Sequence, residues 1–314
     1  MHAAICITIV IAGCSTGVAK GPVEGALVSG SLVQSQATIS LDVLIPREGD
    51  LPAAIDRARD DAKSAGLILI DSLPTTTDKQ VVKVSLVNIE DEQWSHRLPG
   101  YVASKIDRDE FPQVDASPGL VRIEANASPA RAWELLRSVT TIARDLAASQ
   151  HGWIYDSYRA QLHDADTFAT SIPDGRTHDV RAMIRIMGVV STHGELAHIR
   201  SIGLWRLGLP ELYLPDVANS DLDAAMDLVR ATAQTLVQNG SVGRGVIEVD
   251  LAKLPQNWPK PGSGTGRFTW QARWMRGPIH HNAMQIVLST RGSREKAASA
   301  FSAALHRYTG TALH

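Results

Sequence analysis

A unit made of a strand pattern, an amphipathic helix pattern, a glycine and a short apolar strand occurs twice in this chain. In the first copy, Ala37–Pro46 alternates apolar and polar residues, as a strand with one buried face does. Asp50 can cap a helix over Leu51–Ala65, and Gly66 can end that helix before the next apolar run. Strand and helix patterns of this kind each have one apolar side, so they must pack against one another in layers.

The second copy has a strand over 119–125, a helix over 129–150 and Gly152 before the next apolar strand. Both copies end in an Asp-Ser pair, which is Asp71-Ser72 in the first and Asp156-Ser157 in the second. The repetition predicts two related α+β units. We expect the first over residues 36–117, including a long connection, and the second over residues 118–314.

The later part of the chain contains strands that mostly follow one another in pairs, with helix patterns between them. Strand patterns occur at 180–190, 199–214, 245–251, 266–275 and 283–290, and a helix pattern runs from Asp221 to Gln238. Consecutive strands with interspersed helices favour antiparallel sheets over a parallel doubly wound sheet. We therefore predict an α+β fold of mainly antiparallel sheets packed with helices.

The start of the chain suggests export. Residues 3–13 contain no charged side chain and are rich in isoleucine. The run is shorter than the roughly 20 residues that span a bilayer, but it has the length of the apolar core of a secretory signal. The stretch Ile11-Ala12-Gly13-Cys14 resembles the lipobox of bacterial lipoprotein precursors, although the usual Lys or Arg before the apolar run is replaced by His2. From the residues alone, a buried N-terminal strand with an inert cysteine is the alternative.

The lipobox resemblance implies where in the cell the protein is located. Residues 1–13 would be the signal peptide, Cys14 would carry the lipid, and the membrane would be a partner through that lipid. Since Asp does not follow the cysteine, the protein resembles lipoproteins of the outer membrane that face the periplasm. Residues 14–35 are rich in Gly, Ser, Val and Ala, and we expect them to form a flexible tether. Cys6 would leave with the signal, so no disulfide or cysteine nucleophile is expected in the mature chain.

The charge pattern and the glycine pattern argue against two classes of ligand. The 31 basic and 33 acidic side chains are well mixed, so we expect no nucleic-acid partner. Alternate glycines occur within Pro259–Arg267, but a strand follows them, whereas a phosphate-binding loop is followed by a helix. We expect a hairpin loop there and no cofactor.

Asp156 and a histidine pair are the candidates for catalysis and metal binding. Asp156 lies at a strand exit among other ionisable residues, where it could act as an acid, a base or a cation ligand. Asp71 at the equivalent place favours a turn-forming role for both residues. His193 and His198 could bind a metal, but their spacing is not that of zinc peptidases, so we expect a polar hairpin connection and no metal.

Four residues are candidates for binding a protein partner, namely Trp205, Arg206, Trp270 and Trp274. Trp and Arg are enriched among the residues that dominate binding energy at protein contacts. The alternative is that these tryptophans pack the sheets against their helices.

A segment around Trp205, SIGLWRLGLPELYLPDV (201–217), resembles a Gly-Leu, Gly-x-Pro-Glu-Leu pattern of uncharacterised bacterial domains. This resemblance covers the C-terminal half of the chain and implies a fold only.

Together these features favour a lipid-anchored cell-envelope protein whose α+β body binds a macromolecular partner, in an inhibitory, immunity-like or assembly role. The alternative is an envelope-anchored hydrolase or metal-dependent enzyme, and a purely structural envelope protein is a third possibility. A cleft that gathers Asp156 with two histidines would favour the enzyme. A flat face with Trp205, Trp270 or Trp274 would favour the binding protein, and we prefer this non-enzymatic interpretation.

Overall fold

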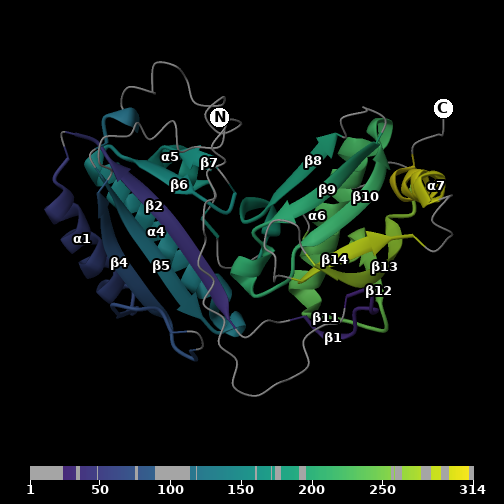
Figure 1. The fold of residues 1–314 in the computed structure, drawn as a ribbon, viewed down its shortest axis with the longest axis horizontal. Helices are drawn as coiled ribbons and strands as arrows, with labels where there is room; N and C mark the ends of the chain where they lie inside the picture. Colours follow the sequence, from purple (N-terminus) through teal and green to yellow (C-terminus); the bar gives the residue numbers. More distant parts are fainter. Residues whose placement is uncertain are drawn as a thin grey trace, which may run out of the picture.

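The computed structural model describes residues 24–32, 36–47, 49–74, 77–88, 114–117, 119–159, 161–170, 172–173, 178–190, 196–255, 258, 264–276, 284–290 and 297–310. Two six-stranded sheets and one two-stranded sheet combine with five α-helices over these residues. The predicted α+β class is confirmed, because nearly all strand pairs are antiparallel. Figure 1 shows the two large sheets side by side, one in each half of the molecule.

The first half is built on a sheet with the strand order β3-β4-β5-β2-β6-β7. Its strands are β2 (Ala37–Ile45), β3 (Ile68–Leu69), β4 (Val81–Asn88), β5 (Gly119–Ala127), β6 (Trp153–Asp156) and β7 (Gln161–His163). Its helices are α1 (Leu51–Ser64), α4 (Ala132–Gln150) and the short α5 (Ala165–Ala169). The units β2-α1-β4 and β5-α4-β6 each enclose a strand of the other, which is the split β-α-β arrangement of ferredoxin-like domains.

The sequence predicted a boundary between residues 117 and 118, but the structure has no division there. β5 pairs with β2 along its whole length, from the Ala37–Ala127 pair to the Ile45–Gly119 pair. The two sequence copies are therefore the two parts of one sheet. Neither copy has a complete sheet without the other, because each one supplies the strand that lies between two strands of its twin.

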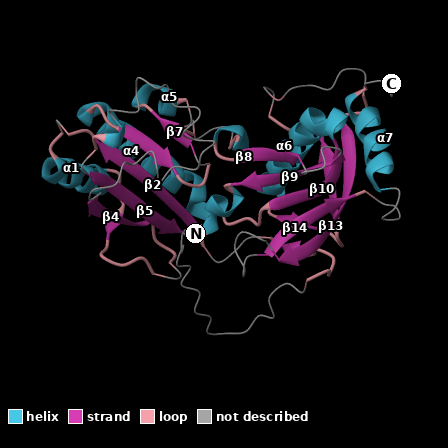
Figure 2. Ribbon diagram, turned by 45° about the horizontal axis from the view of Figure 1, so that its top comes forward, coloured by secondary structure: helices cyan, strands magenta, loops and turns pink. Residues whose placement is uncertain are grey.

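The second half is built on a sheet with the order β12-β13-β14-β10-β9-β8. Its strands are β8 (Arg185–Val190), β9 (Leu196–Ile202), β10 (Leu212–Ala218), β12 (Val246–Asp250), β13 (Arg267–Arg276) and β14 (Met284–Ser289). Helices α6 (Leu222–Asn239) and α7 (Ala297–Thr309) pack on one face of this sheet. Figure 2 shows how the helices and strands of both halves are layered.

Residues 24–32, which were expected to belong to a flexible tether, are part of the second half. Within them, β1 (Gly30–Ser31) pairs with β11 (Ser241–Val242). Val28 and Leu32 are buried in the core, and the backbone N–H of Leu32 donates to the carbonyl oxygen of Gly240. These two apolar side chains explain why the segment is held to the body. Residues 14–23 and 33–35 of the predicted tether lie outside the described residues.

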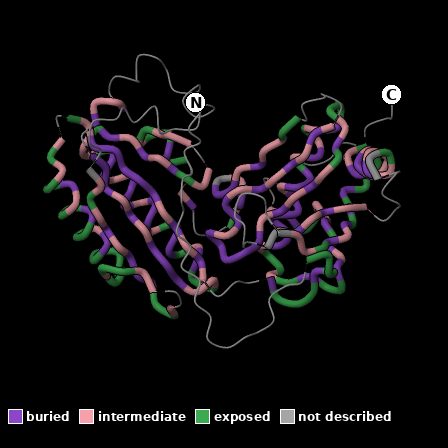
Figure 3. Tube along the Cα trace, viewed as in Figure 1, coloured by how far each residue is buried: buried purple, intermediate pink, exposed green. Residues whose placement is uncertain are grey.

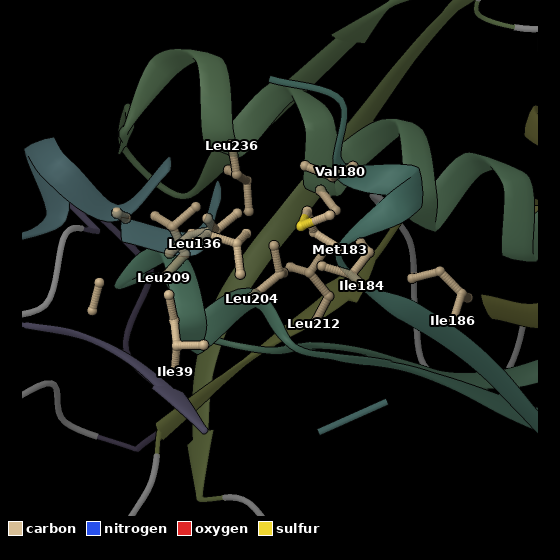
Figure 4. Close-up of a cluster of buried hydrophobic side chains, with 14 of the residues drawn as sticks. Ile39, Leu136, Val180, Met183, Ile184, Ile186, Leu204, Leu209, Leu212 and Leu236 are labelled. Carbon is tan, nitrogen blue, oxygen red and sulfur yellow. The ribbon is translucent and has the colours of Figure 1, made fainter. Parts of the chain in front are cut away.

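Buried apolar side chains from both halves form one continuous core. In Figure 4, Ile39 of β2 and Leu136 of α4 meet Leu204, Leu209 and Leu236 of the second half. Figure 3 shows that buried residues run along the strands of both sheets. The halves are thus joined by a shared core. Among the described helices, none combines the length and apolarity needed to cross a bilayer.

Candidate functional site

The strongest catalytic candidate, Asp156, and the partner-binding candidate Arg206 lie together where the two halves meet. Asp156 is the last residue of β6 in the first half, and Arg206 belongs to a short 3-10 helix, η4 (Leu204–Leu207), in the second half. Arg206 Nη2 donates to Asp156 Oδ1, and both side chains are only 2% exposed. The same oxygen accepts the backbone N–H groups of Tyr158 and Arg159, each at 3.1 Å.

The Tyr158 ring packs on the guanidinium of this ion pair, and the Trp205 ring packs on Tyr158. The Arg206 guanidinium lies 4.5 Å from the centroid of the Tyr158 ring, and the Trp205 ring meets the Tyr158 ring edge-on at 4.1 Å. Burial raises the pKa of the Tyr158 phenol, an effect that the nearby Arg206 charge only partly opposes. The phenol therefore stays protonated at neutral pH. Asp156 is arranged as the buried partner of Arg206, which is the geometry of a structural joint between the halves.

The glycines of the Gly203–Leu212 segment let η4 reach across the junction. Gly203 has a φ of +113° and Gly208 a φ of +72°, both in the region that favours glycine. A Cβ atom at Gly203 would lie 2.9 Å from the carbonyl oxygen of Met183, and one at Gly208 would lie 3.0 Å from Cγ of Pro129 in the first half. Larger residues at these two positions would displace the helix turn that presents Arg206.

The Glu211 carboxylate holds the start of η4 in place through hydrogen bonds. Its Oε1 accepts the backbone N–H of Gly203 at 2.7 Å, and its Oε2 accepts the Ser201 hydroxyl at 2.5 Å. The backbone N–H groups of Leu204 and Trp205 also bond this carboxyl group, which thus satisfies the free amides at the start of η4. Burial raises the pKa of Glu211, and these hydrogen bonds partly counter that effect. The Gly-Leu, Gly-x-Pro-Glu-Leu pattern therefore corresponds to a self-capped turn that carries Arg206.

The predicted partner-binding tryptophans do not form an accessible face. Trp270 is 0% exposed, its Nε1 donates to Thr232 Oγ1 of α6 at 2.8 Å, and its ring stacks on Phe301 of α7. Trp274 is partly buried and packs against the core, as Trp205 packs on Tyr158. Arg206 is buried as well. The alternative interpretation, packing of the sheet against its helices, therefore describes Trp270, and neither Trp270 nor Arg206 is accessible to a partner.

The predicted histidine site is only partly described. His198 lies in β9, where burial and then the neighbouring Arg200 lower its pKa, and its ring contacts that of Tyr213. His193 and Cys14 lie outside the described residues. Within the described part of the chain, no three His, Cys, Asp or Glu side chains are grouped closely enough to hold a metal ion.

The sequence did not reveal a surface on the second sheet, which we call the open face. It is the face turned away from α6 and α7, since residues on the opposite face are buried against these helices. One row of side chains crosses five strands of the open face, in the order Met187, Arg200, Tyr213, Val287 and Arg273. All five are half-exposed or exposed, and the Arg200 guanidinium lies 5.2 Å from the centroid of the Tyr213 ring.

The open face is basic over most of its width. Arg185, Arg200 and Arg273 occupy it, and no carboxylate stands at the described open-face positions of β8, β9, β13 and β14. Two carboxylates, Glu248 and Asp250, lie on the edge strand β12, where Asp250 pairs with Arg267 at 3.5 Å, and Asp216 is exposed at the bulge of β10. The alternation of buried and exposed residues places Arg185 on one side of β8 and Arg200 on the same side of β9. Only the three-dimensional structure shows that the helices cover the other side.

Comparison of the chain with protein-family models, curated proteins and solved structures finds no match. The geometry of the junction and of the open face is therefore the basis for assigning a function.

Proposed function

We propose that this chain is a lipid-anchored protein of the bacterial cell envelope that binds an acidic protein partner through the open face of its second sheet. The observation that carries the binding role is the row of Met187, Arg200, Tyr213, Val287 and Arg273. Tyr, Arg and Met are the residue types enriched in protein interfaces. Because arginines dominate the charge of this face, an acidic surface is the complementary partner.

The anchor is supported by Ile11-Ala12-Gly13-Cys14 at the end of an apolar run. A single saturated chain binds a membrane only marginally, whereas two or more chains hold a protein stably. A cysteine carrying several acyl chains would keep the body at the membrane surface without a spanning helix.

The junction favours binding over hydrolysis as the role of the body. Asp156, the carboxylate with the best sequence position for catalysis, accepts three donors at one oxygen and is buried with Arg206. A general acid or base has to reach a substrate atom. In this structure the Asp156 carboxylate instead links the two halves.

Affinity capture from detergent-solubilised native envelope, with the full chain as bait, tests the proposal. We expect one stoichiometric protein to be retained by the wild type and lost when Arg200→Glu is combined with Tyr213→Ala. Arg59→Glu, on the exposed surface of α1, makes the same charge change elsewhere and is expected to retain the partner. Retention should also weaken as salt rises, because exposed charges are screened. If the open-face variant retains the same proteins as the wild type, or if nothing is retained by either, the proposed binding role is wrong.

A further inference from the structure

We infer that the corner of the second half around β1 and β11 faces the phospholipid headgroups of the bilayer. This inference rests on the proposed lipid anchor at Cys14 and adds an orientation to it. It follows from where the first described residues are bound to the body and from the number of residues between Cys14 and that point.

The chain joins the body at residue 25, beside the end of β13. The backbone N–H of Gly25 donates to the carbonyl oxygen of Trp274 at 2.7 Å, and the Trp274 N–H donates to the carbonyl oxygen of Ala26 at 2.9 Å. The Val28 N–H donates to the carbonyl oxygen of Ala272 at 3.0 Å, and Arg273 Nη1 bonds the carbonyl oxygen of Gly25 at 2.9 Å. Residues 25–28 thus continue the sheet along β13 beyond the end of β12, so they are fixed to its edge.

The chain between the anchor and this edge is short compared with the body. Only residues 15–23 separate Cys14 from Glu24. Even fully extended, ten residue steps reach about 35 Å. A globular body of about 290 residues has a radius of gyration of about 19 Å, which corresponds to a diameter of about 50 Å. The attachment corner therefore cannot lie on the side of the body farthest from the bilayer.

The corner has side chains that suit an interfacial position. Leu27 is 46% exposed, one of five exposed large apolar residues among those described, and Arg244 is exposed near it. An apolar side chain can enter the headgroup region while arginines contact lipid phosphates. Figure 1 shows β1 and β11 at the bottom of the second half, and Figure 3 shows exposed residues gathered there. Since the corner is an edge of the sheet, the open face is turned sideways and stays accessible to a partner.

Energy transfer from the protein to labelled lipid measures this orientation. The full chain, purified from membranes in detergent, is reconstituted into phosphatidylethanolamine–phosphatidylglycerol vesicles that contain a rhodamine-headgroup lipid. A donor dye is placed on Ser29→Cys next to β1, or on Ala169→Cys at the end of α5, and both positions are exposed. Figure 1 shows α5 at the top of the first half and β1 at the bottom of the second half.

We expect several-fold more transfer from position 29 than from position 169. A flexible insertion of about 20 residues between Lys20 and Gly21 should make the two efficiencies converge, because a longer linker releases the constraint on orientation. Equal transfer, or more from position 169, in protein that floats with the vesicles would overturn the orientation and leave the anchor intact. If the wild type does not float with the vesicles, or Cys14→Ser floats equally well, the anchor fails and this inference fails with it.

Discussion

The two large sheets treat their charges differently on the faces that the helices leave uncovered. On the first sheet, Arg122 makes two hydrogen bonds to Asp42 on the adjacent strand, at 2.7 and 2.9 Å. On the same sheet, Lys83 Nζ lies 3.4 Å from Glu124 Oε2, again across neighbouring strands. On the second sheet, the cross-strand neighbours of Arg200 are Met187 and Tyr213. The first sheet neutralises these charges across its strands. On the second sheet, Arg267 is paired with Asp250 in the same way at the β12 edge, but no carboxylate stands directly opposite Arg200 on either neighbouring strand.

Two sheets layered with helices in a similar way can therefore differ in whether the uncovered face is paired internally or left half-exposed. In the first sheet, the charged pairs across strands and a small apolar cluster around Leu44, Val114 and Leu120 complete the face internally. In the second sheet, mixed apolar, aromatic and basic side chains remain half-exposed in one row. In the proposed function, the first half acts as a scaffold that the Asp156–Arg206 joint holds to the second half, which carries the proposed binding surface.

Breaking the joint between the halves should have the largest effect. We expect Arg206→Met to lower the free energy of unfolding by about 3–5 kcal/mol, because it leaves the Asp156 carboxylate buried without its partner. Adding Asp156→Leu to this variant should recover part of the loss, since the unpaired charge is then removed. Arg230→Met, which breaks the more exposed Arg230–Asp227 pair on α6, should change stability by less than about 1 kcal/mol. Urea unfolding measures all three, and similar losses for Arg206→Met and Arg230→Met would contradict the joint.

One arginine substitution on each sheet should show the same difference between the sheets, with smaller changes in the free energy of unfolding. Arg122→Met removes the donor of the buried Asp42 carboxylate, so we expect a loss of about 1–3 kcal/mol. The hydrogen bond to Asp42 is also what most raises the pKa of Arg122. Arg200→Met on the second sheet should stay within about 0.5 kcal/mol of the wild type. A larger stability loss for Arg200→Met than for Arg122→Met would show that the second face, too, is internally paired.

The smallest effect expected is the pH dependence contributed by Glu211. Burial raises its pKa above the ordinary value of 4.5, so the folded state binds this proton more tightly than the unfolded state. Stability from this group is therefore greatest at low pH and declines as pH rises from about 4.5 to the folded pKa. Glu211→Gln removes the titration, and its stability relative to the wild type should increase with pH across that window. Denaturant unfolding at several pH values tests this, and a relative stability that falls with rising pH would contradict it.

Local structure could be predicted well from the sequence, because its signals are local. Asp50 caps α1 by accepting the N–H of Ala53, and the helix occupies Leu51–Ser64, one residue short of the predicted end. The long α4 and α6 also lie where their apolar patterns placed them. These elements depend on caps and periodicity that act within a few residues.

What the sequence could not show depends on contacts between distant residues. The repeated Asp-Ser pairs look equivalent, yet Asp156 is buried against Arg206 and Asp71 is exposed, since η4 reaches only one of them. Trp270 has the alternation of a possible surface residue, but α6 and α7 cover its side of β13. The open face became recognisable only once helix packing had fixed which side of each strand is covered.

The most direct test of the central claim compares the two faces in the intact cell. A photo-crosslinking amino acid is placed at Tyr213 on the second sheet or at Ser85 on the first, and the chain is expressed with its own N-terminal segment in its native host. We predict a protein adduct of one defined size from position 213 and none from position 85. Adducts from position 85 alone, or the same adducts from both positions, would contradict the assignment of the binding surface to the second sheet.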